Sequence, residues 1–252
     1  MSSDPADPGA GLAKHRAEIV AAIRACDRPG LRQPGTRLAA AIWRSAALVR
    51  DPEWWQALSE AGEALAIADR DPAALAALLD LSAATFADYG DRARAEAQWV
   101  RALAILRRAE LDPSPVLTSL GSLYRSWGRL GKALDADLGL ADARRAQDDP
   151  VGTAAALTSV ANTMLTAGRL PTAADYFAQA DELLTALPTP SPATTTIHAQ
   201  ILVSWGHALW DQGEPTPARR HWSRALAMLI DHDDTAADQV RTLLATHAPA
   251  AH

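Results

Sequence analysis

The chain has 252 residues, a formal net charge of −6 and 48% hydrophobic residues, a composition typical of a folded globular protein. It has no run of lysine or arginine that would attract a nucleic acid. It also has no run of 18 apolar residues that could span a membrane. A single cysteine, Cys26, excludes an internal disulfide and a cysteine-based metal cluster. We therefore expect a cytoplasmic protein that uses no cofactor and binds neither nucleic acid nor membrane.

The chain begins with a segment, residues 1–10, that is rich in Asp, Pro, Gly and Ser. It lacks the basic start and apolar core of a signal peptide, so we predict a disordered tail. Residues 11–247 are expected to form one helical domain, since no window alternates in a strand-like way for long. The predicted helices are 11–26, 35–49, 52–69, 72–88, 91–109, 113–127, 130–147, 150–167, 170–187, 193–211, 215–231 and 234–247. The longest predicted linker is 188–196.

The dipeptide Asp-Pro recurs at 51–52, 71–72, 112–113 and 149–150. An aspartate can cap a helix by accepting a backbone N–H, and proline tolerates the first helical position because its missing N–H has no partner there. Four helix-starting prolines, Pro72, Pro113, Pro150 and Pro192, follow one another at 41, 37 and 42 residues. This period predicts a repeat of about forty residues with two helices in each copy.

Four glycines repeat with a similar period: Gly90, Gly128, Gly168 and Gly213 are 38, 40 and 45 residues apart. An alanine follows each glycine by five residues, at Ala95, Ala133, Ala173 and Ala218. In three copies an aromatic residue follows four positions later, at Trp99, Phe177 and Trp222. Such internal repetition predicts stacked helical hairpins, in which small residues let helices approach and aromatic residues fill the gap to the next hairpin.

The repeats resemble the tetratricopeptide repeat, whose pattern is Trp-x2-Leu-Gly-x2-Tyr, then Ala-x3-Phe, then Pro. One copy carries Leu202, Trp205, Gly206, Leu209, Gly213, Ala218 and Trp222, and another carries Leu117, Leu120, Gly121, Tyr124 and Gly128. The best copies span 72–109, 113–147, 150–187 and 193–231, a degenerate copy spans 35–69, and helix 234–247 caps the array. The long repeat is similar to arrays attached to actinobacterial signalling ATPases and regulators. The resemblance implies an all-α solenoid of about five hairpins with flanking helices.

Two packing questions stay open in the sequence. The copy after Gly128 has Asp137 where the aromatic residue belongs. Either Asp137 is buried with a partner, or the register shifts by three and Gly131 is the turn glycine, with Ala136, Leu140 and Ala143 packed inside. We favour the shift. Trp54 and Trp55 are adjacent, and we expect at most one of them to face the core fully.

The resemblance implies that the first helix of each hairpin lines a concave groove. Carried over position by position, the groove residues include Asp88, Ser122, Arg125, Thr158, Asn162, His207, Trp210 and Asp211. Asn162 matches an asparagine that similar arrays use to hold a peptide backbone or a carboxylate, and Arg125 would contact an acidic group. The lysines of the family's carboxylate clamp are missing, so an acidic C-terminus is not the expected ligand.

Trp210 is the residue that the repeat register singles out for function. Trp99, Trp205 and Trp222 fall at packing positions, whereas Trp210 falls on the groove face. An exposed tryptophan there would anchor a peptide or a flat ligand. The alternative is that helix 234–247 folds over the ring and buries it.

Three classes of function are compatible with this pattern. The first is a scaffold that binds a peptide or protein segment in its groove, without catalysis or metal. The second is a regulator that closes around a small molecule or signal peptide. The third is an enzyme in which His207 and Asp211, four residues apart on one helix face, form a hydrogen-bonded acid–base pair. We favour the scaffold; the sequence contains no catalytic motif, and it leaves the oligomeric state open.

Overall fold

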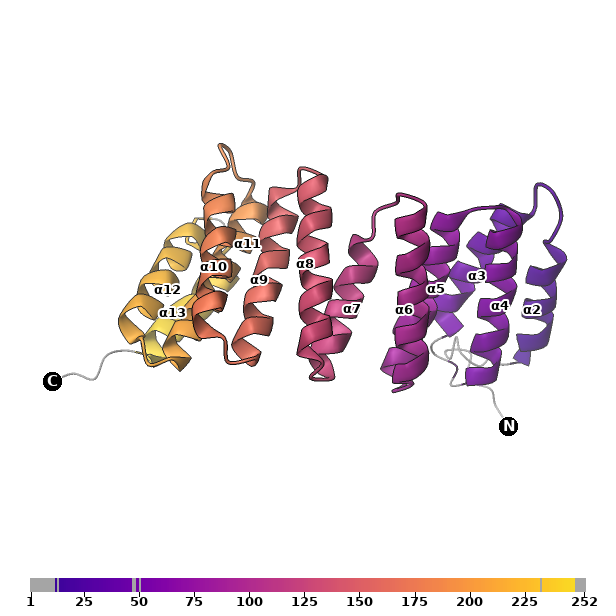
Figure 1. The fold of residues 1–252 in the computed structure, drawn as a ribbon, viewed down its shortest axis with the longest axis horizontal. Coiled ribbons are helices and arrows are strands. Elements are labelled where there is room, and N and C mark those ends of the chain that lie inside the picture. The colour runs from indigo at the N-terminus through magenta and orange to yellow at the C-terminus, as the bar shows by residue number, and fades with distance from the viewer. Residues whose placement is uncertain (1–11, 13, 47–48, 50, 232, 248–252) are drawn as a thin grey trace. The chain divides into compact units, whose positions relative to one another are not determined.

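The computed structural model describes residues 12, 14–46, 49, 51–231 and 233–247. The predicted tail 1–10 lies outside these residues. Within them the chain forms helices and no strand, and successive helices inside each of two compact units run antiparallel (Figure 1). The all-α prediction is confirmed.

The chain divides into two compact units, residues 1–120 and 121–252, and the boundary falls within α7. The first unit contains α2 (Arg16–Ala25), α3 (Arg32–Ala46), α4 (Pro52–Ala68), α5 (Pro72–Asp88), α6 (Arg92–Arg108) and the first half of α7 (Ser114–Ser126). The second contains α8 (Leu130–Ala146), α9 (Pro150–Thr166), α10 (Leu170–Thr185), α11 (Pro192–Asp211), α12 (Pro215–Leu229) and α13 (Asp234–Thr246). A single domain over 11–247 stays a prediction.

Aspartate caps start several helices where the sequence predicted them. Asp51, Asp71 and Asp149 each accept a hydrogen bond from the backbone N–H three residues on, at 3.0, 2.9 and 2.8 Å. Each bond satisfies one N–H that has no partner within the helix. Helix α11 is capped by Ser191, whose Oγ lies 3.1 Å from the Thr194 N–H. The predicted linker 188–196 is therefore too long, because Thr194 and Thr196 are already helical.

The favoured register shift at Gly131 is wrong. Gly128 has φ +68° and is the turn glycine, whereas Gly131 lies inside α8 with no positive φ. Asp137 is 1% exposed, so it occupies the buried aromatic position of the unshifted register. Its carboxylate can be buried because Arg125 donates to it at 2.5 Å and Thr163 at 3.1 Å.

The expectation that only one of Trp54 and Trp55 faces the core is also wrong. They are 5% and 1% exposed. Helix α4 packs against α2 and α3 as well as α5, and adjacent residues of a helix point about 100° apart. Both rings can therefore pack against neighbouring helices. The centroid of the Trp55 ring lies 4.4 Å from that of the Tyr89 ring.

The last three helices close around one apolar cluster in the second unit. Trp222 of α12 is fully buried at its centre, with Ala199 and Leu202 of α11 and Ala237 and Val240 of α13. The Trp222 Nε1 donates to the Val203 carbonyl oxygen at 3.2 Å. Gly206 faces the same indole, and a Cβ there would overlap the ring. The close approach of α11 and α12 thus depends on this glycine.

Candidate functional site: a groove between α11 and α13

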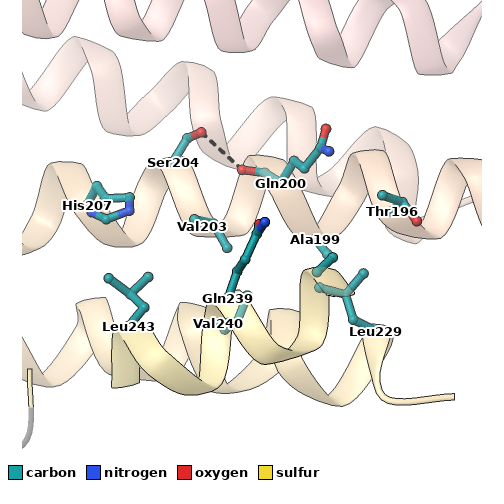
Figure 2. Close-up of a pocket in the computed structure, with 11 residues that line it drawn as sticks. Thr196, Ala199, Gln200, Val203, Ser204, His207, Leu229, Gln239, Val240 and Leu243 are labelled. Atoms are coloured by element: carbon teal, nitrogen blue, oxygen red, sulfur yellow. Dashed lines mark hydrogen bonds between the residues drawn. The ribbon is translucent and has the colours of Figure 1, made fainter. Parts of the chain in front are cut away.

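A groove of about 370 Å³ lies between α11 and α13 (Figure 2). This volume is at the lower end of the range for small-molecule pockets. Its residues come from three helices: Thr196, Ala199, Gln200, Val203, Ser204 and His207 from α11, Leu229 from the end of α12, and Ala236, Gln239, Val240 and Leu243 from α13.

The floor of the groove is apolar because it is the outer surface of the cluster around Trp222. Ala199, Leu229 and Val240 belong to that cluster, and Val203 and Leu243 pack against it. They are brought together because α13 packs on α12, which places the apolar stripe of α13 opposite that of α11. The floor can therefore bury aliphatic side chains of a ligand, at about 25 cal/mol per Å² of apolar surface removed from water.

The rim of the groove is polar and uncharged. Thr196, Gln200 and Ser204 follow one another four residues apart along α11, and the Gln239 side chain extends from α13 toward α11 (Figure 2). Among the described residues that line the groove, none is Asp, Glu, Lys or Arg. Hydroxyl and amide groups can hydrogen-bond a peptide backbone, but a charged ligand would find no counter-ion among them.

Of the predicted site residues, the structure places His207 in this groove. Its ring is edge-on to Trp222, with centroids 5.4 Å apart. His207 and Asp211 are both exposed, and within the described residues no hydrogen bond joins them. The groove therefore presents His207 as a rim residue rather than as half of an oriented acid–base pair.

Trp210 is engaged in packing. The centroid of its ring lies 5.7 Å from that of Trp222 and 4.5 Å from that of His247, the C-cap residue of α13. Arg219 holds this end of α13 by donating to the carbonyl oxygens of Leu244 and His247 at 2.8 and 2.6 Å. The half-buried Trp210 ring is thus covered from the α13 side, the alternative that the sequence left open.

The other predicted groove residues are dispersed. Arg125 is bound to Asp137, which satisfies its charge inside the fold. The Thr158 hydroxyl donates to the Ala154 carbonyl oxygen at 2.8 Å. Asn162 and Ser122 are exposed in the second unit, and Asp88 is exposed in the first. Their role in binding stays a prediction.

A polar cluster that the sequence did not suggest joins α10, α11 and α12. Asp181 contacts the His198 Nε2 at 2.5 Å and accepts from Arg224 at 2.7 Å, and Arg224 also donates to the Thr185 hydroxyl at 3.0 Å. Burial alone would raise the pKa of Asp181, but the hydrogen bonds from His198 and Arg224 outweigh it and lower the pKa to about 2. These residues come from three helices, and no local spacing predicts that they meet.

His221 lies beside this cluster and stacks on Trp205, with ring centroids 4.1 Å apart. Trp205 in turn stacks on Phe177 at 6.0 Å. Burial lowers the pKa of the His221 imidazole, because an apolar surrounding disfavours its charged form. His221 thus packs as a neutral ring near neutral pH.

Replacing Asp181 with asparagine should make the protein less sensitive to acid. The carboxyl has a folded-state pKa of about 2 and an ordinary value of 3.8. Because the folded-state pKa is lowered, the ionised carboxylate stabilises the folded state by about 2 kcal/mol at pH values above the ordinary pKa. This contribution is lost as the pH falls from about 5 toward 2. Urea unfolding should show that, between pH 7 and pH 3, the free energy of unfolding falls by about 1 kcal/mol more in wild type than in Asp181→Asn.

The exposed Asp142, paired with Arg145 at 2.8 Å, provides the matched control. Asp142→Asn should leave the pH dependence close to that of wild type, because exposed ion pairs contribute little. Equal acid sensitivity of wild type and Asp181→Asn would contradict the assignment.

In the described part of the chain, no group of three or more His, Cys, Asp or Glu side chains is arranged to hold a metal ion. No helix there is both long enough and apolar enough to cross a membrane.

These features define an all-α helical-repeat protein with a small groove beside its last described helix. No known protein family model matches the sequence, and no curated protein matches it. Among solved structures, the crystal structure of BtubC (BKLC) from P. vanneervenii is similar, with 14% identity, a TM-score of 0.66 and coverage of 96% of this chain and 95% of that chain. Pseudomonas aeruginosa pilF gives 17% identity, a TM-score of 0.45, and coverage of 86% and 95%. The likeness to BtubC shows a shared fold, and the looser likeness to pilF adds nothing to it.

Proposed function

We propose that this chain is a helical-repeat scaffold that binds a segment of a protein or peptide, and that the groove between α11 and α13 is a binding site. The observation that carries the proposal is the groove itself, an apolar floor edged by uncharged hydrogen-bonding side chains. A peptide needs both features, because its side chains gain from burial while its backbone N–H and C=O groups must keep partners.

The chemistry of the rim selects among possible segments. A carboxylate, phosphate or ammonium group would lose its water, and no Asp, Glu, Lys or Arg lines the groove to compensate for that loss. The proposed ligand is therefore an uncharged segment with aliphatic side chains. This agrees with the missing lysine clamp in the sequence. The ligand-responsive regulator and the acid–base enzyme stay predictions, and no feature of the groove specifically favours them.

The test is to select peptides from a displayed random library on the full-length protein and to measure their affinities for variants. Ser204→Arg should weaken binding of the enriched peptides at least about tenfold, because the long side chain fills the groove and brings a charge over its apolar floor. Isothermal titration calorimetry measures the affinities, and circular dichroism checks that the variant is folded.

Ser159→Arg is the matched control. Ser159 and Ser204 lie two residues before the equivalent repeat positions Ala161 and Gly206. Each donates its hydroxyl to the carbonyl oxygen four residues earlier, at 3.4 and 3.0 Å. Ser159 does not line the groove, so its variant should bind as wild type does. Failure to enrich any peptide, or equal binding by Ser204→Arg, would refute the proposal.

A further inference from the structure

A second cavity, unrelated to the α11–α13 groove, lies in the first unit between α4 and α6. It has a volume of about 340 Å³, and buried Phe86 of α5 contributes to its lining. Gln56, Ser59, Glu60 and Glu63 line it from α4, and Arg94, Gln98 and Arg101 line it from α6. All seven are hydrogen-bonding side chains, so the cavity is suited to a polar ligand.

The two walls of this cavity carry opposite charge. The α4 wall has the carboxylates of Glu60 and Glu63, and the α6 wall has the guanidinium groups of Arg94 and Arg101. Glu60 and Glu63 are three residues apart and Arg94 and Arg101 are seven apart, spacings that place each pair on one face of its helix, and all four residues line the cavity. A ligand of one sign is attracted by one wall and repelled by the other, whereas a ligand with both signs can satisfy both.

One end of the cavity is lined by an ion pair. Arg101 donates to the Glu63 Oε2 at 2.6 Å, and the Ser59 hydroxyl donates to the Glu63 Oε1 at 2.8 Å. Both carboxylate oxygens of this buried residue are thus engaged. Glu63 and Arg101 therefore build the end wall rather than a vacant subsite.

The other end has charged groups that do not meet across the cavity. Glu60 accepts from Gln56 on its own helix at 3.0 Å, and the Arg94 Nε pairs with Asp91 at 3.3 Å, just before its own helix. The Arg94 guanidinium also lies 5.4 Å from the centroid of the Phe86 ring, which helps to hold it in place. Among the described residues, no ion pair links Glu60 to Arg94, and the Gln98 amide has no hydrogen-bond partner.

We infer that this end of the cavity binds a small zwitterion of the α-amino-acid type. The ligand ammonium donates to Glu60, and its carboxylate accepts from Arg94, whose planar guanidinium suits two parallel hydrogen bonds. The Gln98 side-chain amide lies on the same wall as Arg94. It can both donate and accept a hydrogen bond, so it can bind either charged group of the ligand. The volume accommodates an amino acid with its side chain.

The experiment titrates the full-length protein by calorimetry with L-leucine, L-glutamine and L-serine, and then with two analogues that each lack one charge. N-acetyl-L-leucine has lost the ammonium, and L-leucinamide has lost the carboxylate. At least one amino acid should bind, and both analogues of leucine should bind at least about tenfold more weakly than leucine, since hydrogen bonds to charged groups are the strong ones. Binding of either analogue as tightly as leucine would overturn the inference, as would the absence of binding by all three amino acids.

Variants then locate the site. Glu60→Gln and Arg94→Gln should each weaken the affinity at least about tenfold, and both residues are exposed, so the fold should persist. Glu53→Gln and Arg107→Gln are matched controls, because these exposed residues lie on the same two helices but outside the cavity. They should bind as wild type does. Unchanged affinity in Glu60→Gln and Arg94→Gln would overturn the assignment.

Discussion

Replacing Arg125 with methionine should destabilise the protein by about 3 kcal/mol, because it leaves the buried Asp137 carboxylate without its counter-ion. Asp137 is 1% exposed, and Thr163 would remain as its partner at 3.1 Å. One hydroxyl cannot compensate for the loss of both a charge and a hydrogen bond at 2.5 Å. Urea unfolding at neutral pH, followed by circular dichroism, measures the change.

The double variant Arg125→Met/Asp137→Leu should recover most of that stability. Leucine has as many side-chain heavy atoms as aspartate in the same branched shape, and an apolar pair can replace a buried ion pair at little cost. Arg145→Met breaks the exposed pair with Asp142 and should cost no more than about 0.5 kcal/mol. If Arg125→Met costs no more than Arg145→Met, the buried pair does not stabilise the fold as described.

Replacing Gly206 with alanine should destabilise the second unit by about 2–3 kcal/mol, although alanine is the better helix former. The added methyl group would overlap the indole of Trp222. That ring is fully buried and is surrounded by Trp210, His207 and His247, so it cannot move aside. Thermal unfolding should show a lower Tm, and near-ultraviolet circular dichroism should show altered tryptophan packing.

Gly131→Ala is the matched control for Gly206→Ala. Gly131 also lies within a helix, but a Cβ there meets no atom within 4 Å. The same substitution should therefore stabilise the protein by about 0.5–1 kcal/mol, because alanine loses less conformational entropy on folding. Equal effects at the two glycines would show that the Trp222 contact does not limit the approach of α11 and α12.

Much of the fold could be predicted because its signals are local. Asp71 and Pro72 start a helix through a bond that spans three residues, and Gly128 ends one through its own φ of +68°. The repeat period then places Trp99 and Trp222 inside, where they are 4% and 0% exposed. Each of these inferences depends on residues close in sequence or equivalent in successive repeats.

The candidate sites were less predictable, because they depend on which side chains meet across helices. His207 was predicted to line the concave groove of the repeats, and the structure instead shows it lining the pocket between α11 and α13. The Gln239 side chain in that pocket comes from α13, and no repeat position pointed to it. The opposing charges of Glu60 and Arg94 were likewise missed, since they come from the second helices of two different hairpins.

The sequence by itself determined that the chain is a helical repeat, where most helices start, and that Trp99 and Trp222 are buried. Only the tertiary structure decided that Asp137 is buried, that Trp210 is covered by the end of α13, and that Arg125 is bound within the fold. The physical reason is that periodicity fixes the face of a helix on which a side chain lies. Its burial and charge pairing depend on a neighbouring helix, whose contacting residue lies outside the local repeat of the helix, 12 residues away for Arg125 and Asp137 and 26 for Thr163 and Asp137.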